Sequence, residues 1–341
     1  MSIRRFKGRA VSIALLSLIP PLRAQQLPTW KDPSPHTTKF VTVQEGVRLE
    51  VLDWGGSGRP LMLLAGGGDT AHVFDDFAPK LTPSFHVYGI TRRGFGESGF
   101  SPKDYGADRL GDDVLAVLDA LNLKKPVLVG HSLGGEELSS VATRHPSRVS
   151  ALVYLEAAYP YALDNGKGPT WKEFQDLKDL APQAPPPSES DPALASFAAL
   201  QQAWLRALGF APPEGELHQQ YATTPDGRVG KQRDFPGDAM MLQGMKKYAN
   251  IPVPALAIFA IPHALGKWVN DSTDPKVHEA AKAFSEADLF LTTRQANVFE
   301  EGVPAAHVVR LRGADHYVYL SNEADVLREM KSFFSTLSQS Q

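Results

Sequence analysis

One serine of this chain occurs in a setting that could make it a nucleophile. An apolar run at residues 127–129 leads into the pattern Gly-x-Ser-x-Gly around Ser132, and a helical pattern follows. The flanking glycines, Gly130 and Gly134, allow a turn that is too tight for a Cβ atom. A serine hydroxyl attacks an acyl carbon once a base removes its proton. The pattern therefore predicts hydrolysis or acyl transfer through Ser132.

This segment resembles the nucleophile elbow of the α/β-hydrolase superfamily, in which a strained strand-to-helix turn lifts a serine above a sheet. Residues 91–98 resemble a loop of the same family that follows the fourth strand, with Thr91 in place of the usual aspartate. The motifs run in the family's order from about residue 61 to residue 317. The resemblance implies a serine hydrolase that uses no cofactor and no metal ion.

The resemblance also implies a histidine base after the last strand. His316 follows the expected last strand at residues 308–311 and precedes a helical pattern at residues 323–334. The nine other histidines lack this context, and we expect structural or surface positions for them. His263, for example, is expected in a loop or on the surface.

The acid that would orient His316 has three candidates. Glu156 directly follows an apolar run at residues 152–155, which resembles the placement of the acid in some haloalkane dehalogenases. A buried carboxylate at the end of such a run needs a partner, and the Nδ1 hydrogen of His316 could be that partner. The alternative is that Glu156 pairs with an arginine or caps a loop, which would leave Asp271 or Asp274 as the acid.

An oxyanion hole would come from two backbone N–H groups. Leu133 follows Ser132 and supplies the first. The segment Ala-Gly-Gly-Gly-Asp at residues 65–69 resembles the family's His-Gly-x loop, so Gly67 matches the second. Ala65 stands where histidine is common, which is a departure from the family pattern.

The order of predicted elements indicates an α/β fold with a doubly wound, mostly parallel sheet. A hairpin is predicted at residues 40–54. Continuous apolar runs, typical of parallel strands covered on both faces, follow between helical patterns. These runs occupy residues 61–64, 86–90, 127–129, 152–155 and 255–260, and residues 308–311 are expected as the last strand.

A long insertion interrupts this alternation. Residues 159–250 hold 11 of the 27 prolines, helical patterns around residues 171–180 and 192–208, and no clear strand. Insertions of this length in a compact domain are functional lids or linkers. We expect a helical lid at 159–250, inserted into a hydrolase core formed by residues 25–158 and 251–341.

The pattern of the N-terminal residues predicts a signal peptide. Residues 1–24 contain five basic residues, no acidic residue and an apolar run of ten residues, which is too short to span a bilayer. We therefore expect a secreted or periplasmic protein without a stable membrane anchor. Removing this segment leaves 30 basic and 38 acidic residues, a formal net charge of −8, which argues against nucleic acid as a partner. The chain has no cysteine, which excludes cysteine nucleophiles and thiolate metal sites.

These features favour a carboxylesterase that cleaves small or medium apolar esters through an acyl-enzyme on Ser132. Two alternatives stay open. The first is an aminopeptidase similar to prolyl iminopeptidases, for which Glu173, Asp176 and Asp179 could hold a substrate ammonium group. The second is a binding protein on a hydrolase scaffold that has lost its activity.

Overall fold

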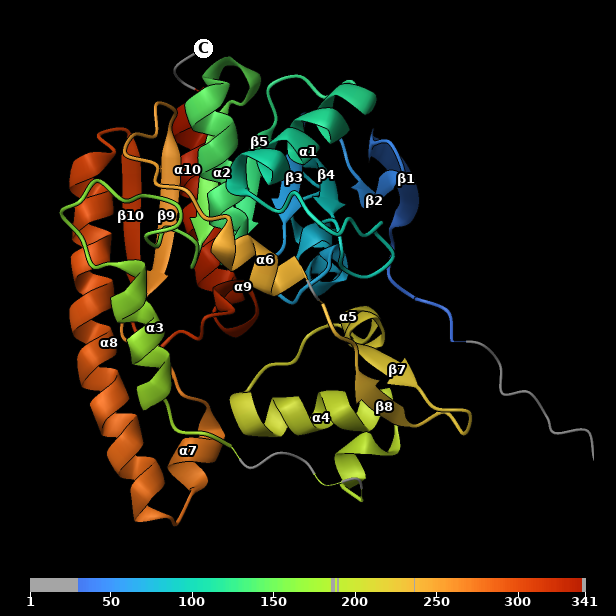
Figure 1. Ribbon diagram of the computed structural model, residues 1–341, viewed down its shortest axis with the longest axis vertical. Coiled ribbons are helices and arrows are strands. Elements are labelled where there is room, and N and C mark those ends of the chain that lie inside the picture. The colour runs from blue at the N-terminus through green and yellow to red at the C-terminus, as the bar shows by residue number, and fades with distance from the viewer. Residues whose placement is uncertain (1–29, 185–187, 189, 236, 339–341) are drawn as a thin grey trace, which may run out of the picture. The chain divides into compact units, whose positions relative to one another are not determined.

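The computed structural model describes residues 30–184, 188, 190–235 and 237–338. The predicted signal peptide lies outside these residues. Residues from Asp32 onward belong to one unit, which is built around an eight-stranded sheet (Figure 1). Its strands are β1 (Thr37–Gln44), β2 (Val47–Gly55), β3 (Arg59–Leu64), β4 (Phe85–Ile90), β5 (Val127–His131), β6 (Ala151–Leu155), β9 (Ala255–Ala260) and β10 (Ala306–Leu311).

The order of strands across the sheet is β1-β2-β4-β3-β5-β6-β9-β10. The first two pairs, β1 with β2 and β2 with β4, are antiparallel, and the remaining pairs are parallel. The carboxyl ends of six strands therefore meet at one edge of the sheet, where doubly wound folds place their ligand sites. The predicted α/β architecture with a mostly parallel sheet is confirmed.

Both faces of the sheet are covered, which explains why its strands read as continuous apolar runs. On one face, Met62 and Leu64 of β3 pack in a core shared with α1, α2 and α8. On the other face, Leu61 and Leu63 pack in a core shared with η1 and α10. The helices on the first face are α1 (Ala107–Ala120), α2 (Gly134–Arg144), α3 (Trp171–Leu180) and α8 (Pro275–Gly302); those on the second are η1 (Ala71–Phe74), η2 (Ala78–Lys80), α9 (Val318–Ser321) and α10 (Glu323–Ser338).

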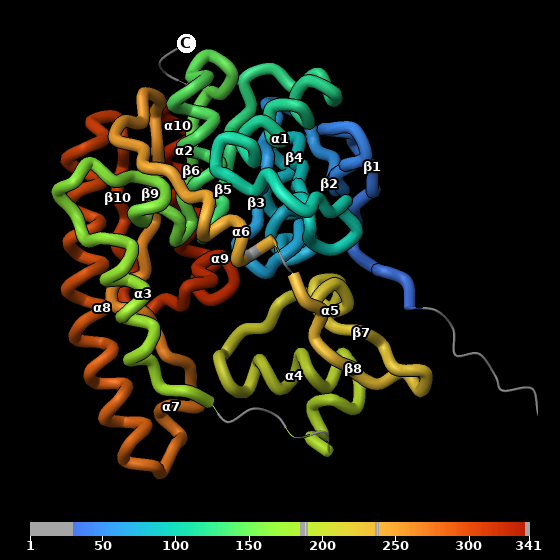
Figure 2. Tube along the Cα trace, viewed as in Figure 1, coloured from blue at the N-terminus to red at the C-terminus, as the bar shows by residue number. Residues whose placement is uncertain are grey.

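The helices of the segment expected as a lid, residues 159–250, pack against several different elements of the structure. Helix α3 packs against α8, which runs beside β10 (Figure 2). A small apolar cluster joins α4 and α5 to the hairpin of β7 and β8, and α6 packs beside α1 through Met241. The elements involved are η4 (Pro192–Ala195), α4 (Phe197–Leu208), α5 (Glu214–Gln220), β7 (Tyr221–Thr223), β8 (Val229–Gln232) and α6 (Gly237–Gln243).

Two features of the fold differ from the sequence-based expectation. The segment that was expected to hold no clear strand contains β7 and β8, which pair only with each other. The 28-residue helix α8 was not anticipated, because charged and small residues interrupt its apolar stripe.

Short elements complete the described chain: η3 (Pro146–Arg148) and α7 (Lys267–Asp271). No helix among the described residues is both long and apolar enough to cross a bilayer.

Candidate functional site

Ser132 sits at a sharp bend between β5 and α2. Its φ angle of 47° lies in the left-handed region, which is unusual for a residue with a side chain. Its N–H donates to the carbonyl of Leu155 (3.2 Å), and its own carbonyl accepts from the N–H of Gly135 (2.9 Å). A Cβ atom at Gly135 would lie 2.0 Å from the carbonyl oxygen of Ala157, so the close approach of α2 to the chain after β6 requires glycine. This strained bend places Ser132 at the carboxyl edge of the sheet.

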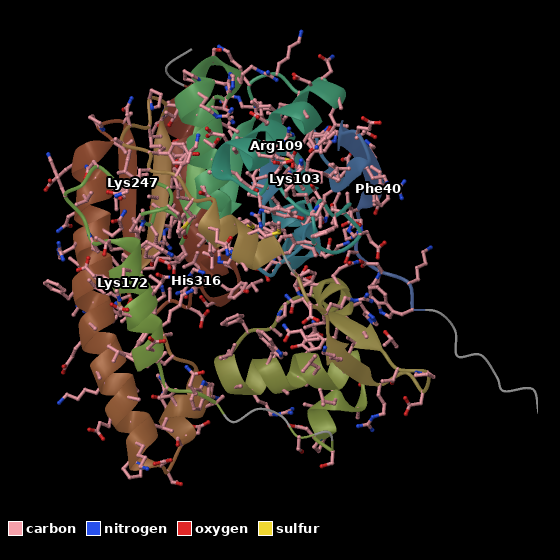
Figure 3. All side chains as sticks on the ribbon, in the orientation of Figure 1. Phe40, Lys103, Arg109, Lys172, Lys247 and His316 are labelled. Carbon is pink, nitrogen blue, oxygen red and sulfur yellow. The ribbon has the colours of Figure 1, made fainter. Side chains whose placement is uncertain are left out.

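Ser132 opens onto a cavity of about 540 Å³, and His316 lines the same cavity. His316 follows β10 and lies next to α9 (Figure 3). No direct hydrogen bond joins Ser132 to His316 in the described residues. Catalytic hydrogen bonds are often long in the absence of substrate. The structure thus brings both residues to one cavity, open for a substrate.

Glu156 supplies a carboxylate to His316. It directly follows β6 with a φ of 51°, and its side chain is fully buried. Its Oε2 lies 3.2 Å from the Nδ1 of His316, and its Oε1 accepts a hydrogen bond from the N–H of Ala260 (2.5 Å). Burial alone would raise the pKa of Glu156, but His263 and His316 hold it well below its ordinary value. Glu156 is therefore an anion that contacts the imidazole of His316.

His263 is a partner of Glu156 that the sequence analysis missed. Its Nε2 lies 2.6 Å from Glu156 Oε2, and its Nδ1 lies 2.9 Å from Asp288 Oδ1 on α8. Burial would lower the pKa of His263, but Glu156 and Asp288 raise it well above its ordinary value. The expected loop position is confirmed, since His263 lies between β9 and α7 (Lys267–Asp271), but its side chain is mostly buried and forms a charged link between two buried carboxylates. Helix α8 was absent from the predicted fold, so nothing in the sequence indicated that Asp288 would lie beside His263.

A hydroxyl also contacts the buried carboxylate. Tyr159 donates to Glu156 Oε2 at 2.8 Å, so three side chains converge on one oxygen atom. Burial raises the pKa of the nearby Tyr161 well above its ordinary value. A hydrogen bond between Tyr161 and Ser132 lowers this pKa, but by less than burial raises it. Both phenols stay neutral at physiological pH and line the cavity.

The alternative acids lie elsewhere. Asp271 is the last residue of α7, and Asp274 caps α8 by accepting a hydrogen bond from the N–H of Lys276 (2.9 Å). Neither lines the cavity that Ser132 and His316 share. The structure therefore brings Glu156, but neither aspartate, to His316.

The glycine-rich loop after β3 reaches the cavity through Gly67. Arg92 holds this loop in place: its guanidinium donates to the carbonyls of Ala65 (2.7 Å) and Gly66 (2.9 Å). The same guanidinium forms a two-point ion pair with Glu137 on α2 (2.6 and 3.1 Å). Arg92 thus couples the loop to the helix that follows Ser132, although Ala65 replaces the usual histidine. Leu133, the other expected oxyanion donor, also lines the cavity.

His131 supports the loop that carries His316. It is almost fully buried, and its Nε2–H donates to the carbonyl of His316 (3.1 Å). Burial lowers the pKa of His131 well below its ordinary value, so the ring stays neutral. His131 therefore holds the backbone of His316.

Glu136, in the first turn of α2, makes the stability of the protein depend on pH. Its Oε1 accepts from the N–H of Lys246 (3.2 Å), while its Oε2 has no hydrogen-bond partner in the described structure. Burial raises the pKa of Glu136 to about 8. Between its ordinary value and this one, the folded state binds more protons than the unfolded state, so stability falls as pH rises through that window.

We therefore expect Glu136→Gln to stabilise the protein at pH 9, by about 1–3 kcal/mol, and to change little at pH 5. Urea unfolding of wild type and variant at both pH values measures this difference. The exposed Glu45→Gln serves as the control and should follow wild type at both. An equal effect of Glu136→Gln at pH 5 and pH 9 would contradict the assignment.

Two of the three carboxylates considered for ammonium binding are engaged outside the cavity. Glu173 accepts hydrogen bonds from the N–H and hydroxyl of Thr170, and Asp176 pairs with Lys172 in an exposed salt bridge. Asp179 is exposed, and none of the three carboxylates lines the cavity. The structure therefore offers no support for the aminopeptidase alternative from these residues.

One group in the cavity could also bind a metal ion by geometry. The donor atoms of Glu156, His263 and His316 all lie within 4.8 Å of one another. Their contacts with one another and with Asp288 already account for these side chains. No feature of the cavity requires an ion there.

Comparisons with known proteins agree with this architecture. A model of the alpha/beta hydrolase fold family matches residues 59–322. The chain is 34% identical over 150 residues to a 2-hydroxymuconate semialdehyde hydrolase of Pseudomonas sp. strain CF600, covering 40% of this chain and 52% of that protein. It is 30% identical over 148 residues to a bifunctional esterase/perhydrolase of Acinetobacter calcoaceticus, covering 41% and 53%. The chain thus spans about half the length of these curated relatives.

A likeness in fold extends further along the chain. The crystal structure of an E-2-(acetamidomethylene)succinate hydrolase superposes with a TM-score of 0.59 at 18% identity. That superposition covers 88% of this chain and 99% of the other.

Proposed function

Because this chain belongs to the alpha/beta hydrolase fold family, we propose that it is a serine hydrolase that cleaves carboxylic esters. One observation carries the proposal: Ser132, on a strained bend, shares a cavity with His316, whose Nδ1 lies 3.2 Å from the buried Glu156. The family relationship supports hydrolase activity, and the relatives include an esterase/perhydrolase.

In the proposed mechanism, the Ser132 hydroxyl attacks the acyl carbon while His316 takes its proton through Nε2. Glu156 accepts the Nδ1–H of His316 and stabilises the imidazolium that forms. The N–H groups of Gly67 and Leu133 would stabilise the negative charge on the former carbonyl oxygen. His316 then protonates the leaving alcohol. In the second half of the reaction, His316 takes a proton from water, and the water oxygen attacks the acyl carbon of the acyl-enzyme. His316 then returns the proton to Ser132 as the carboxylic acid is released.

The cavity walls favour an apolar group on the substrate. Six aromatic and aliphatic side chains line part of the cavity, and burying an apolar chain against them is favourable. These residues are Trp171, Phe174, Leu177, Leu242, Leu265 and Phe284. Four of the six come from α3 and α6, so we propose that the segment 159–250 acts as the lid that sets substrate preference.

A comparison of model substrates tests the proposal. Purified protein is assayed with p-nitrophenyl acetate, butyrate and octanoate and with proline p-nitroanilide, and the Ser132→Ala variant supplies the background rate. We expect turnover of the esters at least about 100-fold above that background, with butyrate or octanoate preferred over acetate. Preference for the anilide would instead support the aminopeptidase, and no turnover of any ester would contradict the proposal.

A further inference from the structure

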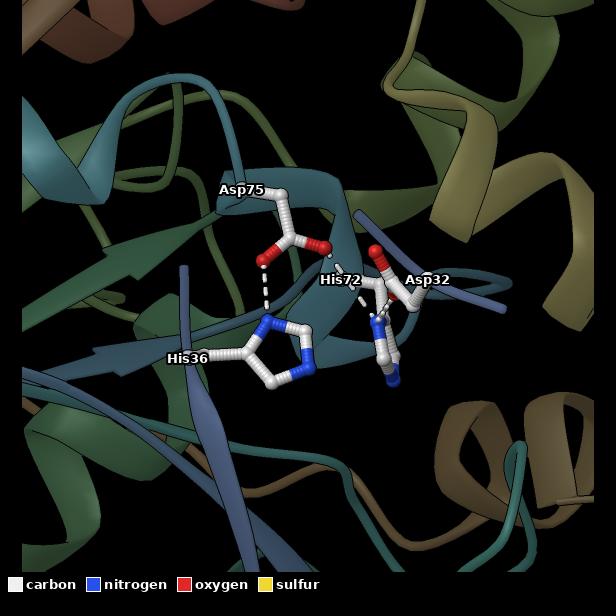
Figure 4. Close-up of side chains that lie close together, drawn as sticks. All are labelled: Asp32, His36, His72 and Asp75. Carbon is white, nitrogen blue, oxygen red and sulfur yellow. Dashed lines mark hydrogen bonds and ion pairs between the residues drawn. The ribbon is translucent and has the colours of Figure 1, made fainter. Parts of the chain in front are cut away.

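A second cluster of chemically active side chains lies outside the cavity, where the segment before β1 meets η1 (Figure 4). Asp32 and His36 come from that segment, His72 lies within η1, and Asp75 follows η1. One donor atom from each side chain lies within 4.8 Å of the others. His72 and Asp75 are buried, and Asp32 and His36 are partly buried. Nothing in the proposed ester hydrolysis uses these four residues.

Two carboxylate oxygens of this cluster converge on a single ring nitrogen. The Oδ2 atoms of Asp32 and Asp75 lie 3.1 and 3.2 Å from the Nδ1 of His72. A ring nitrogen carries at most one hydrogen, so it cannot donate a well-directed bond to both oxygens. The two separations are close to the ligand–ligand spacing of about 3.3 Å in a tetrahedral shell with zinc–ligand distances of about 2.0–2.1 Å. A cation among these three atoms would satisfy both carboxylates.

The surrounding contacts are those of a supported metal site. The second oxygen of each carboxylate has its own contacts: Asp32 Oδ1 accepts from the N–H of Ser34 (2.9 Å), and Asp75 Oδ1 accepts from the indole N–H of Trp54 (3.0 Å) and lies 2.7 Å from the Nδ1 of His36. The far nitrogen of His72, Nε2, lies 3.5 Å from Glu50 Oε1, within ion-pair distance but without a hydrogen bond in the described structure. A carboxylate behind the far nitrogen is the usual outer support of a histidine that binds a metal ion.

We propose that Asp32, His36, His72 and Asp75 bind one divalent transition-metal ion, with zinc the best match. Zinc is commonly held by histidine nitrogens and carboxylate oxygens in tetrahedral sites, and four protein ligands form a closed, structural site. An ion that displaces the ring protons on binding would be held by two carboxylates and two neutral imidazoles, which balance a divalent charge. The ion would tie the segment before β1 to η1, directly after the loop that carries Gly67.

Zinc binding to the purified full chain tests this site. The protein is stripped with EDTA, dialysed and titrated with zinc chloride by calorimetry, with bound zinc counted by mass spectrometry. We expect one tight equivalent, and a rise in Tm of about 3 °C or more at saturating zinc. His36→Gln and Asp32→Asn, at the less buried side of the cluster, should each abolish the tight equivalent and the rise in Tm.

The matched control is His86→Gln. His86 also contacts an aspartate, Asp53, at 2.8 Å, but lies outside the cluster, so this variant should bind zinc as wild type does. Absence of a tight equivalent in wild type would overturn the proposal and leave a hydrogen-bonded ion-pair cluster. Loss of binding in His263→Gln with retention in His36→Gln would also overturn it, because zinc would then occupy the cavity. Both outcomes can be observed whether or not the protein hydrolyses esters.

Discussion

Ser132→Ala is expected to lower kcat/KM for a p-nitrophenyl ester by about 10⁴- to 10⁶-fold, since removal of a catalytic serine has effects of this size. Alanine cannot form the acyl-enzyme, while the binding walls of the cavity stay in place. The left-handed backbone at this position also suits alanine no worse than serine, so the fold should persist. Initial rates, together with circular dichroism and thermal unfolding, separate loss of chemistry from loss of structure.

Ser139→Ala is the control for this variant. Ser139 is a buried serine on the same helix, α2, and its hydroxyl bonds to that of Tyr154 (3.0 Å). Its replacement removes a buried hydroxyl without touching the cavity and should leave turnover within a few-fold of wild type. A Ser132→Ala protein that keeps more than about one hundredth of wild-type turnover would contradict the assignment of the nucleophile.

Glu156→Gln should lower kcat by about 10³- to 10⁴-fold, because an amide in the place of the orienting acid favours the wrong tautomer of the histidine. The substitution conserves shape, so KM should change far less than kcat. Steady-state kinetics with a p-nitrophenyl ester measure the two constants separately. Thermal unfolding is needed beside them, because His263 keeps only Asp288 as an anionic partner in this variant.

The alternative acids give matched controls for this substitution. Asp271→Asn and Asp274→Asn remove one carboxylate each from positions outside the cavity, and both variants should stay within about twofold of wild-type kcat. Near-normal turnover of Glu156→Gln, with a large loss in either aspartate variant, would move the role of the acid away from Glu156.

Much of the sheet could be predicted because its strands are buried on both faces. The run at residues 255–260, for example, is apolar throughout and forms β9, fully covered on either side. The turn at Ser132 carried an equally clear pattern, since close packing there demands glycines at fixed positions. Where local sterics or complete burial dictate residue type, the amino-acid sequence is informative.

The remainder depends on contacts between distant segments. His263 and Asp288 become partners only because α8 passes beside the chain after β9, and nothing near either residue in the sequence signals this. The cluster of Asp32, His36, His72 and Asp75 likewise forms from segments about forty residues apart. The short strands β7 and β8 have three and four residues, of which only Val229 is buried, so they lack the apolar pattern by which a strand is recognised.

Covalent labelling with a fluorophosphonate tests the central claim most directly. The probe phosphonylates a serine only when a neighbouring base activates it and the oxyanion is stabilised. Purified wild-type protein, digested and analysed by mass spectrometry, should carry one adduct on the peptide that contains Ser132, with ester hydrolysis lost in proportion. Glu156→Gln should be labelled more slowly, and heat-unfolded protein should not be labelled. Absence of an adduct on Ser132 in folded wild-type protein, or an adduct on another serine that accompanies inactivation, would contradict the proposed mechanism.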